Sequence, residues 1–490
     1  MGWLSLAIWT PIVFGVILLF FNRADQVRFG RWFALIGSII SFAVTIPLYV
    51  GFNPHTSGMQ FVENVPWIPR FNINYHLGVD GISVWFVLLT AFMTFIVIAA
   101  GWEIIQKRVN QYNAAFLILS GMMIGVFTAL DGILFYMAFE STLVPMYLII
   151  GVWGGKNRIY AAIKFFLYTF LGSLMMLVSF IYLYARSGGS FNVLDWQALP
   201  LSATAQTWLF FGLFAAFAVK VPMWPIHTWL PDAHVEAPTG GSVILAAIML
   251  KLGCYGFLRF SLPILPDASH EWAWLMIFLS LMAIIYIGLV ALVQPDMKKL
   301  VAYSSIAHMG YTTAGFFSFT GMSIEGGVVQ MLSHGFVSGA MFLCIGVLYD
   351  RLHTHEISAF GGVINSMPRF GAFALLFFMA NCGLPGTSGF VGEWMVILGT
   401  VKVNFWIGLL IATGLISGAG YSLWMFKRVY YGAVANGKVR AMKEINAREC
   451  FIMALMAITV LWLGLYPAFF TNLMDTSVAH LVQQVALSKL

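Results

Sequence analysis

The chain has 490 residues, of which 60% are hydrophobic and only 9% are Asp, Glu, Lys or Arg, and its mean hydropathy is +0.88. These values exclude an ordinary soluble globular protein and indicate an integral membrane protein with many spans in the lipid bilayer. The formal net charge of +6 does not indicate a nucleic-acid partner, because the basic residues fall mainly in short segments between apolar stretches. Since no soluble stretch interrupts the apolar pattern, we predict a single membrane domain over residues 1–490.

Stretches of about 20 apolar residues, which are long enough to cross a bilayer as a helix, recur along the whole chain. The sequence therefore predicts an all-α integral membrane protein with about 14 transmembrane helices. The first stretch lacks the basic start and the cleavage site of a signal peptide, so we expect it to be retained as a helix. The expected spans cover residues 4–21, 31–50, 82–101, 114–130, 132–153, 160–185, 206–230, 239–260, 272–294, 301–320, 326–349, 370–400, 404–430 and 450–473.

Basic residues are shared unequally between the two alternating sets of loops. One set holds Arg23, Arg28, Arg31, Lys107, Arg108, Lys156, Arg158, Lys298, Lys299, Arg351, Arg369, Lys427, Arg428, Lys438, Arg440, Lys443 and Arg448. The other set, together with the two tails, holds only Arg70, Arg186, Arg259, Lys402 and Lys489. Because cytoplasmic loops carry the excess of basic residues, this pattern predicts that both termini lie on the outer side.

Two of the expected spans are interrupted. Pro222 and Pro225 fall within the seventh span, and each removes a backbone donor from the helix. The run Asn381–Gly389, which is rich in glycine and contains a proline, has the same effect in the twelfth span. Two broken helices five spans apart predict two five-helix repeats of inverted topology, over residues 114–260 and 272–430.

Four carboxyl and amine side chains form a mid-membrane ionisable series on four separate expected spans: Glu140, Lys220, Lys251 and Glu393. With a helical rise of about 1.5 Å per residue, Glu140, Lys220 and Lys251 would lie about 13, 21 and 18 Å from the ends of their spans. A lysine at the bilayer centre costs about 2.5–3.5 kcal/mol, so such residues indicate a functional role. The alternatives are a structural ion pair for the lysines, a protonated Glu140 bonded to a neighbouring helix, and a Glu393 that sits at the membrane boundary.

His227, His308 and His334 also lie in or beside spans, and each imidazole can accept and release a proton near neutral pH. A histidine in a membrane span is often only a packing residue, so this alternative stays open for all three. Lys164 lies near the inner end of the sixth span, where its side chain can reach the membrane surface, and we treat it as a secondary candidate. The whole series favours conduction of a small cation, most simply H⁺, over transport of an organic solute.

The sequence contains no motif that binds a redox centre or a nucleotide. The cysteines, Cys254, Cys344, Cys382 and Cys450, are scattered and form no Cys-x-x-Cys pair. Neither a phosphate-binding loop nor a dinucleotide-binding glycine motif is present. We therefore expect no cofactor and no metal ion in this chain.

Five runs of sequence carry a family resemblance: FAVKVPMWPIHTWLPDAHVEAPTGGSVILAAIMLK, LFYMAFESTLVPMYLIIGVWGG, KKLVAYSSIAHMGY, VVQMLSHGFVSGAMF and LPGTSGFVGEW. They resemble the core motifs of the antiporter-like membrane subunits of respiratory complex I and of Mrp-type cation/proton antiporters. Within this family the run VPWIPRFNINYHLGVDGIS is most similar to the M-type subunits of bacterial NADH:quinone oxidoreductase. Glu393 agrees, because the M type has glutamate where its sister subunits have lysine.

The resemblance implies a non-redox, proton-translocating subunit of the H⁺-translocating NADH:quinone oxidoreductase, in the bacterial inner membrane with both termini on the periplasmic side. Glu140 and Lys220 would form an input-side pair, Lys251 and the histidines would carry protons along a hydrated axis, and Glu393 would release them outside. NADH, FMN, iron–sulfur clusters and quinone would bind in partner subunits, and L-type and N-type antiporter-like subunits would be neighbours. The alternatives are a subunit of an Mrp-type Na⁺/H⁺ antiporter and a purely structural subunit.

Overall fold

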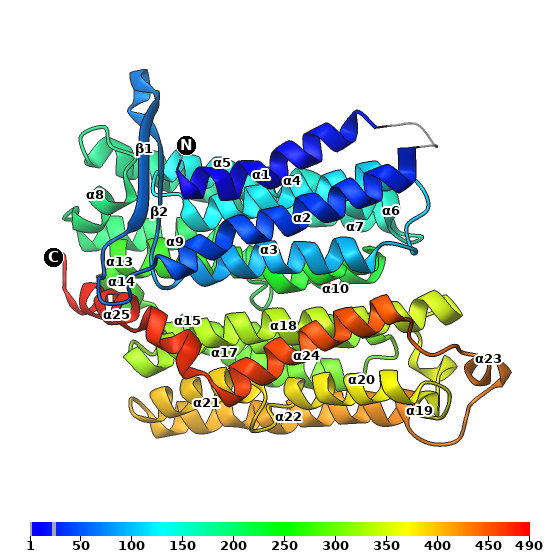
Figure 1. The fold of residues 1–490 in the computed structure, drawn as a ribbon. Helices are drawn as coiled ribbons and strands as arrows, with labels where there is room; N and C mark the ends of the chain where they lie inside the picture. Colours follow the sequence, from blue (N-terminus) through cyan, green and yellow to red (C-terminus); the bar gives the residue numbers. More distant parts are fainter. Residues whose placement is uncertain (1, 22–25) are drawn as a thin grey trace.

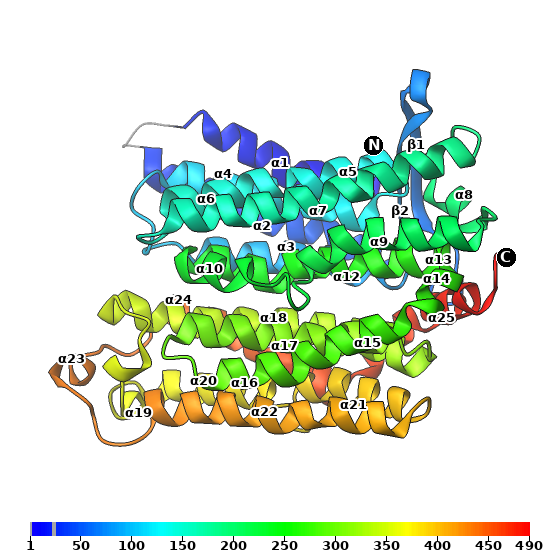
Figure 2. The same ribbon diagram turned by 180° about the vertical axis from the view of Figure 1, so that it is seen from behind.

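The computed structural model describes residues 2–21 and 26–490, so Arg23 of the first inner loop lies outside the described residues. The long helices lie side by side with similar directions, those of the first half of the chain in one group and those of the second half in another (Figures 1 and 2). The chain is thus a helical membrane protein, as the sequence predicts.

The first half, up to the end of the eighth expected span, is built mainly of helices. They are α1 (Trp3–Leu19), α2 (Val27–Val50), α3 (Ser83–Ala100), α4 (Val109–Thr128), α5 (Gly132–Ser141), α6 (Leu143–Trp153), α7 (Arg158–Arg186), α8 (Val193–Ala198), α9 (Ala203–Lys220), α10 (Trp229–Glu236), α11 (Thr239–Ile244), the π-helical turn η3 (Leu245–Met249), α12 (Leu250–Gly256), the π-helical turn η4 (Phe257–Ser261) and α13 (Leu262–Ile264).

The second half follows after a short connecting helix. Its elements are α14 (Pro266–Glu271), α15 (Ala273–Leu281), the π-helical turn η5 (Met282–Ile287), α16 (Gly288–Leu292), α17 (Met297–Phe316), α18 (Gly321–Leu352), the 3-10 turn η6 (Ile357–Ala359), α19 (Val363–Ser366), α20 (Pro368–Asn381), α21 (Ser388–Val401), α22 (Phe405–Tyr430), α23 (Gly437–Arg440), α24 (Ala447–Leu465) and α25 (Ala468–Ala486).

Within the described residues, 11 helices or joined helices are long and apolar enough to cross a membrane, and Trp3–Leu19 and Ser388–Val401 are shorter apolar helices. The most apolar window of α18, and that of the joined helices over residues 239–264, are completely buried. By contrast, only 33–39% of the apolar windows of α2, α7 and α24 is buried, as expected for helices that face lipid. Helix α18 and the joined helices over residues 239–264 form the middle of the molecule, where the two groups of helices meet. The number of 14 crossings and the inverted repeats at 114–260 and 272–430 stay predictions.

Both predicted helix breaks are present. In the first, α9 ends at Lys220 and α10 begins at Trp229, and the backbone N–H of Met223 donates to the carbonyl of Ala218 at 2.8 Å. In the second, α20 ends at Asn381 and α21 begins after two glycines with positive φ. Proline removes the donor that would continue each helix, so the position of both breaks follows from local chemistry.

Two elements were not predicted. The first is an antiparallel hairpin of β1 (Gln60–Ile68) and β2 (Ile73–Val79), joined by the 3-10 turn η2 (Pro69–Phe71), within what the sequence indicated to be a loop. The second is α25, since the last expected span ran on to residue 473, whereas α24 ends at Leu465. The hairpin and both termini lie at one end of the helical bundle, here called the hairpin end, and α19 and α23 lie at the opposite, basic end (Figure 1).

Two basic residues that the sequence placed in loops are buried instead. Arg259 lies in η4 and makes an ion pair with Asp80 at 2.5 Å between Nη2 and Oδ2. Lys298 lies in the first turn of α17 and is 4% exposed. Counting charges in loops could not detect this, because burial depends on which helices pack over the loop.

Candidate functional site: a buried chain of ionisable groups

Lys251 lies at the beginning of α12 and is completely buried, with 0% exposure. Its ammonium group donates to Nδ1 of His334 on α18 at 2.6 Å and to the carbonyl of Ala246 at 2.5 Å. Ala246 belongs to η3, and such π-helical turns within α-helices are frequent at functional sites. Lys251 therefore has a proton acceptor on a neighbouring helix but no carboxylate within 4 Å in the described structure.

His334, which contacts Lys251, also lies near a second histidine. The ring centroids of His334 and His308, on α17, lie 5.6 Å apart. Nε2 of His334 is buried and has no hydrogen-bond partner in the part of the chain that the structure describes. One ring nitrogen of His334 thus faces Lys251, while the other is free to take part in a proton transfer.

His308 is held between two acceptors. Its Nδ1 lies 2.9 Å from Oε1 of Glu393 on α21, and its Nε2 lies 3.1 Å from Oδ1 of Asn381 at the end of α20. The amide Nε2 of Gln330 lies 3.2 Å from the same Nδ1 of His308 and 3.3 Å from Oε1 of Glu393. When both ring nitrogens of His308 carry protons, both face acceptors, and the Gln330 amide donates to Glu393 instead. The geometry therefore suits an imidazolium–carboxylate pair.

The break between α20 and α21 positions the groups that surround His308. It brings Asn381, at the last residue of α20, and Glu393, in the second turn of α21, to the same histidine. The amide of Asn381 also donates to the Ser422 hydroxyl on α22 at 2.8 Å. Glu393 is 2% exposed, so it is a buried group and not a glutamate at the membrane boundary.

Glu140 and Lys220 form a separate group. Lys220 is the last residue of α9, is 1% exposed, and has its ammonium 3.5 Å from the Thr142 hydroxyl and 4.7 Å from the centroid of the Phe139 ring. No ion pair within 4 Å joins the two groups in the described structure, although their charges act on each other. Oε1 of Glu140 is buried without a hydrogen-bond partner among the described residues. The expected pair is thus not in direct contact.

Gly253 allows the helices that carry the two lysines to pack closely. A Cβ atom at this position would lie 2.8 Å from the carbonyl of Phe217 and 3.0 Å from Cβ of Lys220. Only a glycine allows α12 to pass α9 at this distance without a shift of backbone atoms. The helix that carries Lys251 therefore packs directly on the end of α9, although no hydrogen bond joins the two lysines in the structure as described.

The two remaining candidates lie apart from this chain of groups. His227 falls in the break between α9 and α10, is buried, and has no partner for Nδ1 among the described residues. Lys164 makes an ion pair with Asp232 at 2.7 Å, where both side chains are partly exposed. The structure brings together Lys251, His334, His308 and Glu393, but it does not bring His227 or Lys164 into hydrogen-bond contact with them.

Comparisons with known proteins identify the family. The family described as NADH:quinone oxidoreductase/Mrp antiporter, TM, matches residues 129–417, and that described as NADH-ubiquinone oxidoreductase chain 4, amino terminus, matches residues 8–129. The NADH-quinone oxidoreductase subunit M of Rhodobacter capsulatus is 49% identical, over 98% of this chain and 96% of its own length. The chain belongs to the NADH-quinone oxidoreductase subunit M family.

Solved structures agree with this assignment to the subunit M family. A chain of respiratory complex I from Thermus thermophilus with bound NADH is 31% identical and superposes with a TM-score of 0.90, covering 98% of this chain and 99% of that chain. A chain of the Mrp complex from Dietzia sp. DQ12-45-1b is 22% identical with a TM-score of 0.84, covering 98% of this chain and 52% of that chain. At this identity the second likeness is one of fold alone.

Two buried basic residues of this subunit M family member were missed as candidates. His234 on α10 is completely buried, stacks on Phe342 with 4.5 Å between ring centroids, and has no hydrogen-bond partner for either ring nitrogen in the structure as described. Lys298 donates to the carbonyl of Ala237 at 2.7 Å. His234 stands within a motif that carried the resemblance, which was a usable signal, whereas nothing local distinguishes Lys298 from its neighbour Lys299.

The described residues contain no group of three or more His, Cys, Asp or Glu side chains arranged to hold a metal ion. The cysteines are all free, and Cys254 and Cys344 are buried among apolar residues. The contacts of the site join amine, imidazole and carboxyl groups, which can exchange protons.

Proposed function

We propose that this chain is a proton-translocating, non-redox membrane subunit of an NADH:quinone oxidoreductase. The observation that carries the proposal is the buried series from Lys251 through His334 and His308 to Glu393, in which each group can bind and release a proton. Membership of the subunit M family supports the same conclusion. Protons would move from the cytoplasm to the periplasm, with the energy supplied by quinone reduction in other subunits.

In this mechanism Lys251 gives its proton to Nδ1 of His334 along the 2.6 Å contact. The two histidine rings make no direct hydrogen bond, so a rotation of one ring or a single intervening water would carry the proton on to His308. His308 then protonates Glu393 across 2.9 Å. A change of 1.36 kcal/mol in the electrostatic energy of a proton at Lys251 alters its occupancy tenfold, so charge movements in neighbouring subunits can drive the transfer.

The charge pattern supports a proposed orientation in the membrane. With the basic end of the bundle in the cytoplasm, both termini lie on the periplasmic side of a bacterial inner membrane.

NADH, FMN, iron–sulfur clusters and quinone would bind in partner subunits, and other membrane subunits, including L-type and N-type antiporter-like subunits, would flank this chain. An Mrp-type Na⁺/H⁺ antiporter subunit is the second candidate, but only likeness of fold favours it.

Proton pumping by inside-out membrane vesicles tests the role of Glu140 and Lys220. We expect Glu140→Gln and Lys220→Ala to lower both pumping and coupled NADH oxidation by about tenfold or more, because each removes a proton-exchanging group from a buried position. Lys156→Ala, which removes an exposed lysine from a loop of the same half, serves as the control. Unchanged pumping per NADH in an assembled complex would make the pair structural, and loss of Na⁺/H⁺ exchange alone would favour the antiporter.

Gly383 offers a test that changes no ionisable group. Its φ is +74°, and a Cβ atom there would lie 2.7 Å from Oε2 of Glu393. We expect Gly383→Ala to displace Glu393 from His308 and to slow proton pumping, in addition to a backbone cost of about 1–2 kcal/mol. Gly432→Ala is the matched control, because Gly432 has a φ of +91° but nothing within 4 Å of its added Cβ. Equal pumping by the two variants would show that the contact with Glu393 is irrelevant.

A further inference from the structure

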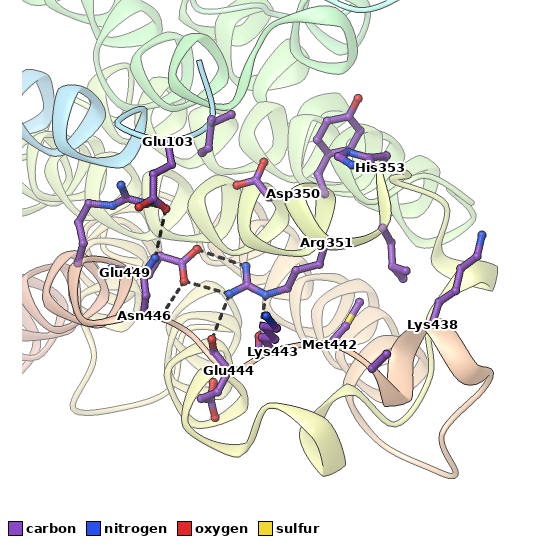
Figure 3. Close-up of a pocket in the computed structure, with 15 residues that line it drawn as sticks. Glu103, Asp350, Arg351, His353, Lys438, Met442, Lys443, Glu444, Asn446 and Glu449 are labelled. Carbon is purple, nitrogen blue, oxygen red and sulfur yellow. Dashed lines mark hydrogen bonds and ion pairs between the residues drawn. The ribbon is translucent and has the colours of Figure 1, made fainter. Parts of the chain in front are cut away.

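A pocket of about 980 Å³ opens at the basic end of the bundle, and ion pairs lie along its wall (Figure 3). Glu449 pairs with Arg351 at 3.0 Å, and Glu103, whose side chain is 66% exposed, pairs with Arg448 at 3.0 Å. Groups in contact with water exchange protons with it in both directions, so these pairs do not oppose the return of translocated protons. Control over the return of protons therefore depends on the buried groups of the candidate site.

Gln330, on α18, contacts both members of the pair formed by His308 and Glu393, and it is only 1% exposed. Its amide Nε2 lies 3.2 Å from Nδ1 of His308 and 3.3 Å from Oε1 of Glu393, and these two atoms lie 2.9 Å from each other. The carbonyl oxygen of Gln330 is buried without a hydrogen-bond partner among the described residues. The amide group is therefore held through its nitrogen, which can donate to either member of the pair.

Asn381 determines which ring nitrogen of His308 gains and loses a proton. Its amide nitrogen donates to the Ser422 hydroxyl at 2.8 Å, so its carbonyl oxygen Oδ1 is the atom that lies 3.1 Å from Nε2 of His308. Because Oδ1 is an acceptor, the hydrogen-bond network assigns a proton to Nε2 in the neutral ring as well as in the imidazolium. Nδ1 is therefore the nitrogen that exchanges its proton with Glu393.

The partner of the Gln330 amide depends on where the shared proton lies. When His308 is an imidazolium and Glu393 is a carboxylate, Nδ1 carries a proton, so Gln330 donates to Oε1 of Glu393. When Glu393 holds the proton and His308 is neutral, Nδ1 is an acceptor that Gln330 reaches at 3.2 Å. A hydrogen bond to a carboxylate is about twice as strong as one to a neutral acceptor, so the amide returns to Glu393 once that group is ionised.

We propose that Gln330 is a positioning residue that gates proton exchange between His308 and Glu393, a role that rests on the proposed function of the chain as a proton translocator. While Glu393 is ionised, the amide stays on the carboxylate and leaves Nδ1 open to the next proton from Lys251. A proton that reaches Glu393 from the periplasmic side instead sends the amide to Nδ1, so the returning proton finds this acceptor occupied. In the forward step the proton leaves Nδ1 and binds Oε1, and the summed charge of the pair stays the same.

Inside-out vesicles that contain the whole complex allow a direct test, because the periplasmic side then faces the lumen that the pump acidifies. The variants are Gln330→Met, which has a similar length but no donor, and Gln330→Asn, whose shorter side chain holds its amide away from the pair. The readouts are assembly, the initial rate of acidification with NADH, and the decay of the pH gradient once NADH is exhausted. Gln294→Met is the matched control, because the half-buried Gln294 amide of the same half of the chain donates only to the Val290 carbonyl, at 2.9 Å.

We expect both Gln330 variants to lower the initial rate by about twofold and to speed the decay of the gradient by about tenfold, since one hydrogen bond no longer opposes return. The added decay should vanish in Gln330→Met/Glu393→Gln, which cuts the route at Glu393, and Gln294→Met should behave as the wild type.

Three results would overturn the gate: a decay as slow as in the wild type, a lower initial rate without faster decay, or added decay that persists in the double variant. If the gate fails in one of these ways while Glu393→Gln alone stops pumping, the proposed function still stands. If Glu393→Gln pumps normally in an assembled complex, the proposed function fails together with the gate.

Discussion

Replacement of Lys251 by methionine is expected to lower proton pumping by about 100-fold while the complex still assembles. Lys251 is the start of the series that ends at Glu393, and its ammonium donates to His334 at 2.6 Å. Methionine has a similar length and fills the same apolar surroundings, so packing should change little. Without the amine, the imidazole of His334 has no donor on α12, and the series is interrupted at its first step.

The measurement compares Lys251→Met with Lys251→Arg in inside-out vesicles. Arginine keeps a positive charge at this depth but does not deprotonate near neutral pH, so we expect it to be as inactive as methionine. Lys427→Met, at an exposed position near the end of α22, controls for loss of a lysine in general. Pumping restored by arginine would mean that a fixed charge is enough, and the relay mechanism would then be wrong.

The Asp80–Arg259 pair is expected to give the largest effect on stability. Arg259 and Asp80 are buried, and the carboxylate also accepts from the backbone N–H of Ser83 at 2.8 Å. Removing one partner of a buried ion pair leaves an uncompensated charge and costs about 3–5 kcal/mol. We therefore expect Asp80→Asn to lower the thermal stability of the detergent-solubilised complex substantially, whereas Glu103→Gln, which breaks an exposed pair, should cost less than about 1 kcal/mol.

The double variant Asp80→Asn/Arg259→Met should recover much of the loss, because it removes the buried charge together with its partner. Burial alone would raise the pKa of the Asp80 carboxyl, but Arg259 and the hydrogen bonds from Ser83 lower it below its usual value. A lowered folded-state pKa stabilises the protein above the unfolded-state pKa of about 3.9, and this contribution is lost as the pH falls through the folded-state value. A double variant no more stable than Asp80→Asn would contradict this account.

The sequence determined the features that depend on local chemistry. A helix of about 20 apolar residues spans a bilayer wherever it occurs, so the spans could be read from hydropathy. Proline and glycine interrupt a helix through their own backbones, so the breaks after Lys220 and Asn381 were found at the correct places. Lys251 and Glu393 could be selected because an ionisable residue in an apolar stretch is costly in any fold.

Only the tertiary structure decided which of these groups meet. Spacing along the chain does not fix which helix faces which, so the position of His334 between Lys251 and His308 could not be derived. The same reason applies to Glu140 and Lys220, which make no ion pair within 4 Å in the described structure, while the Lys220 ammonium lies 4.7 Å from the centroid of the Phe139 ring. A carboxylate and an amine in neighbouring spans attract each other, but the packing of the helices that carry them sets their distance.

Tertiary packing also determined which side chains are buried at the ends of the helices. Lys298 and Lys299 are adjacent and chemically identical, yet only Lys298 is buried, because it points toward the connection between α10 and α11. The hairpin of β1 and β2 and the helix α25 were missed for a related reason: their segments are too polar or too short to give a membrane signal. The sequence determined which stretches form long apolar helices and which ionisable residues fall within them, while packing between helices decided the partners of those residues.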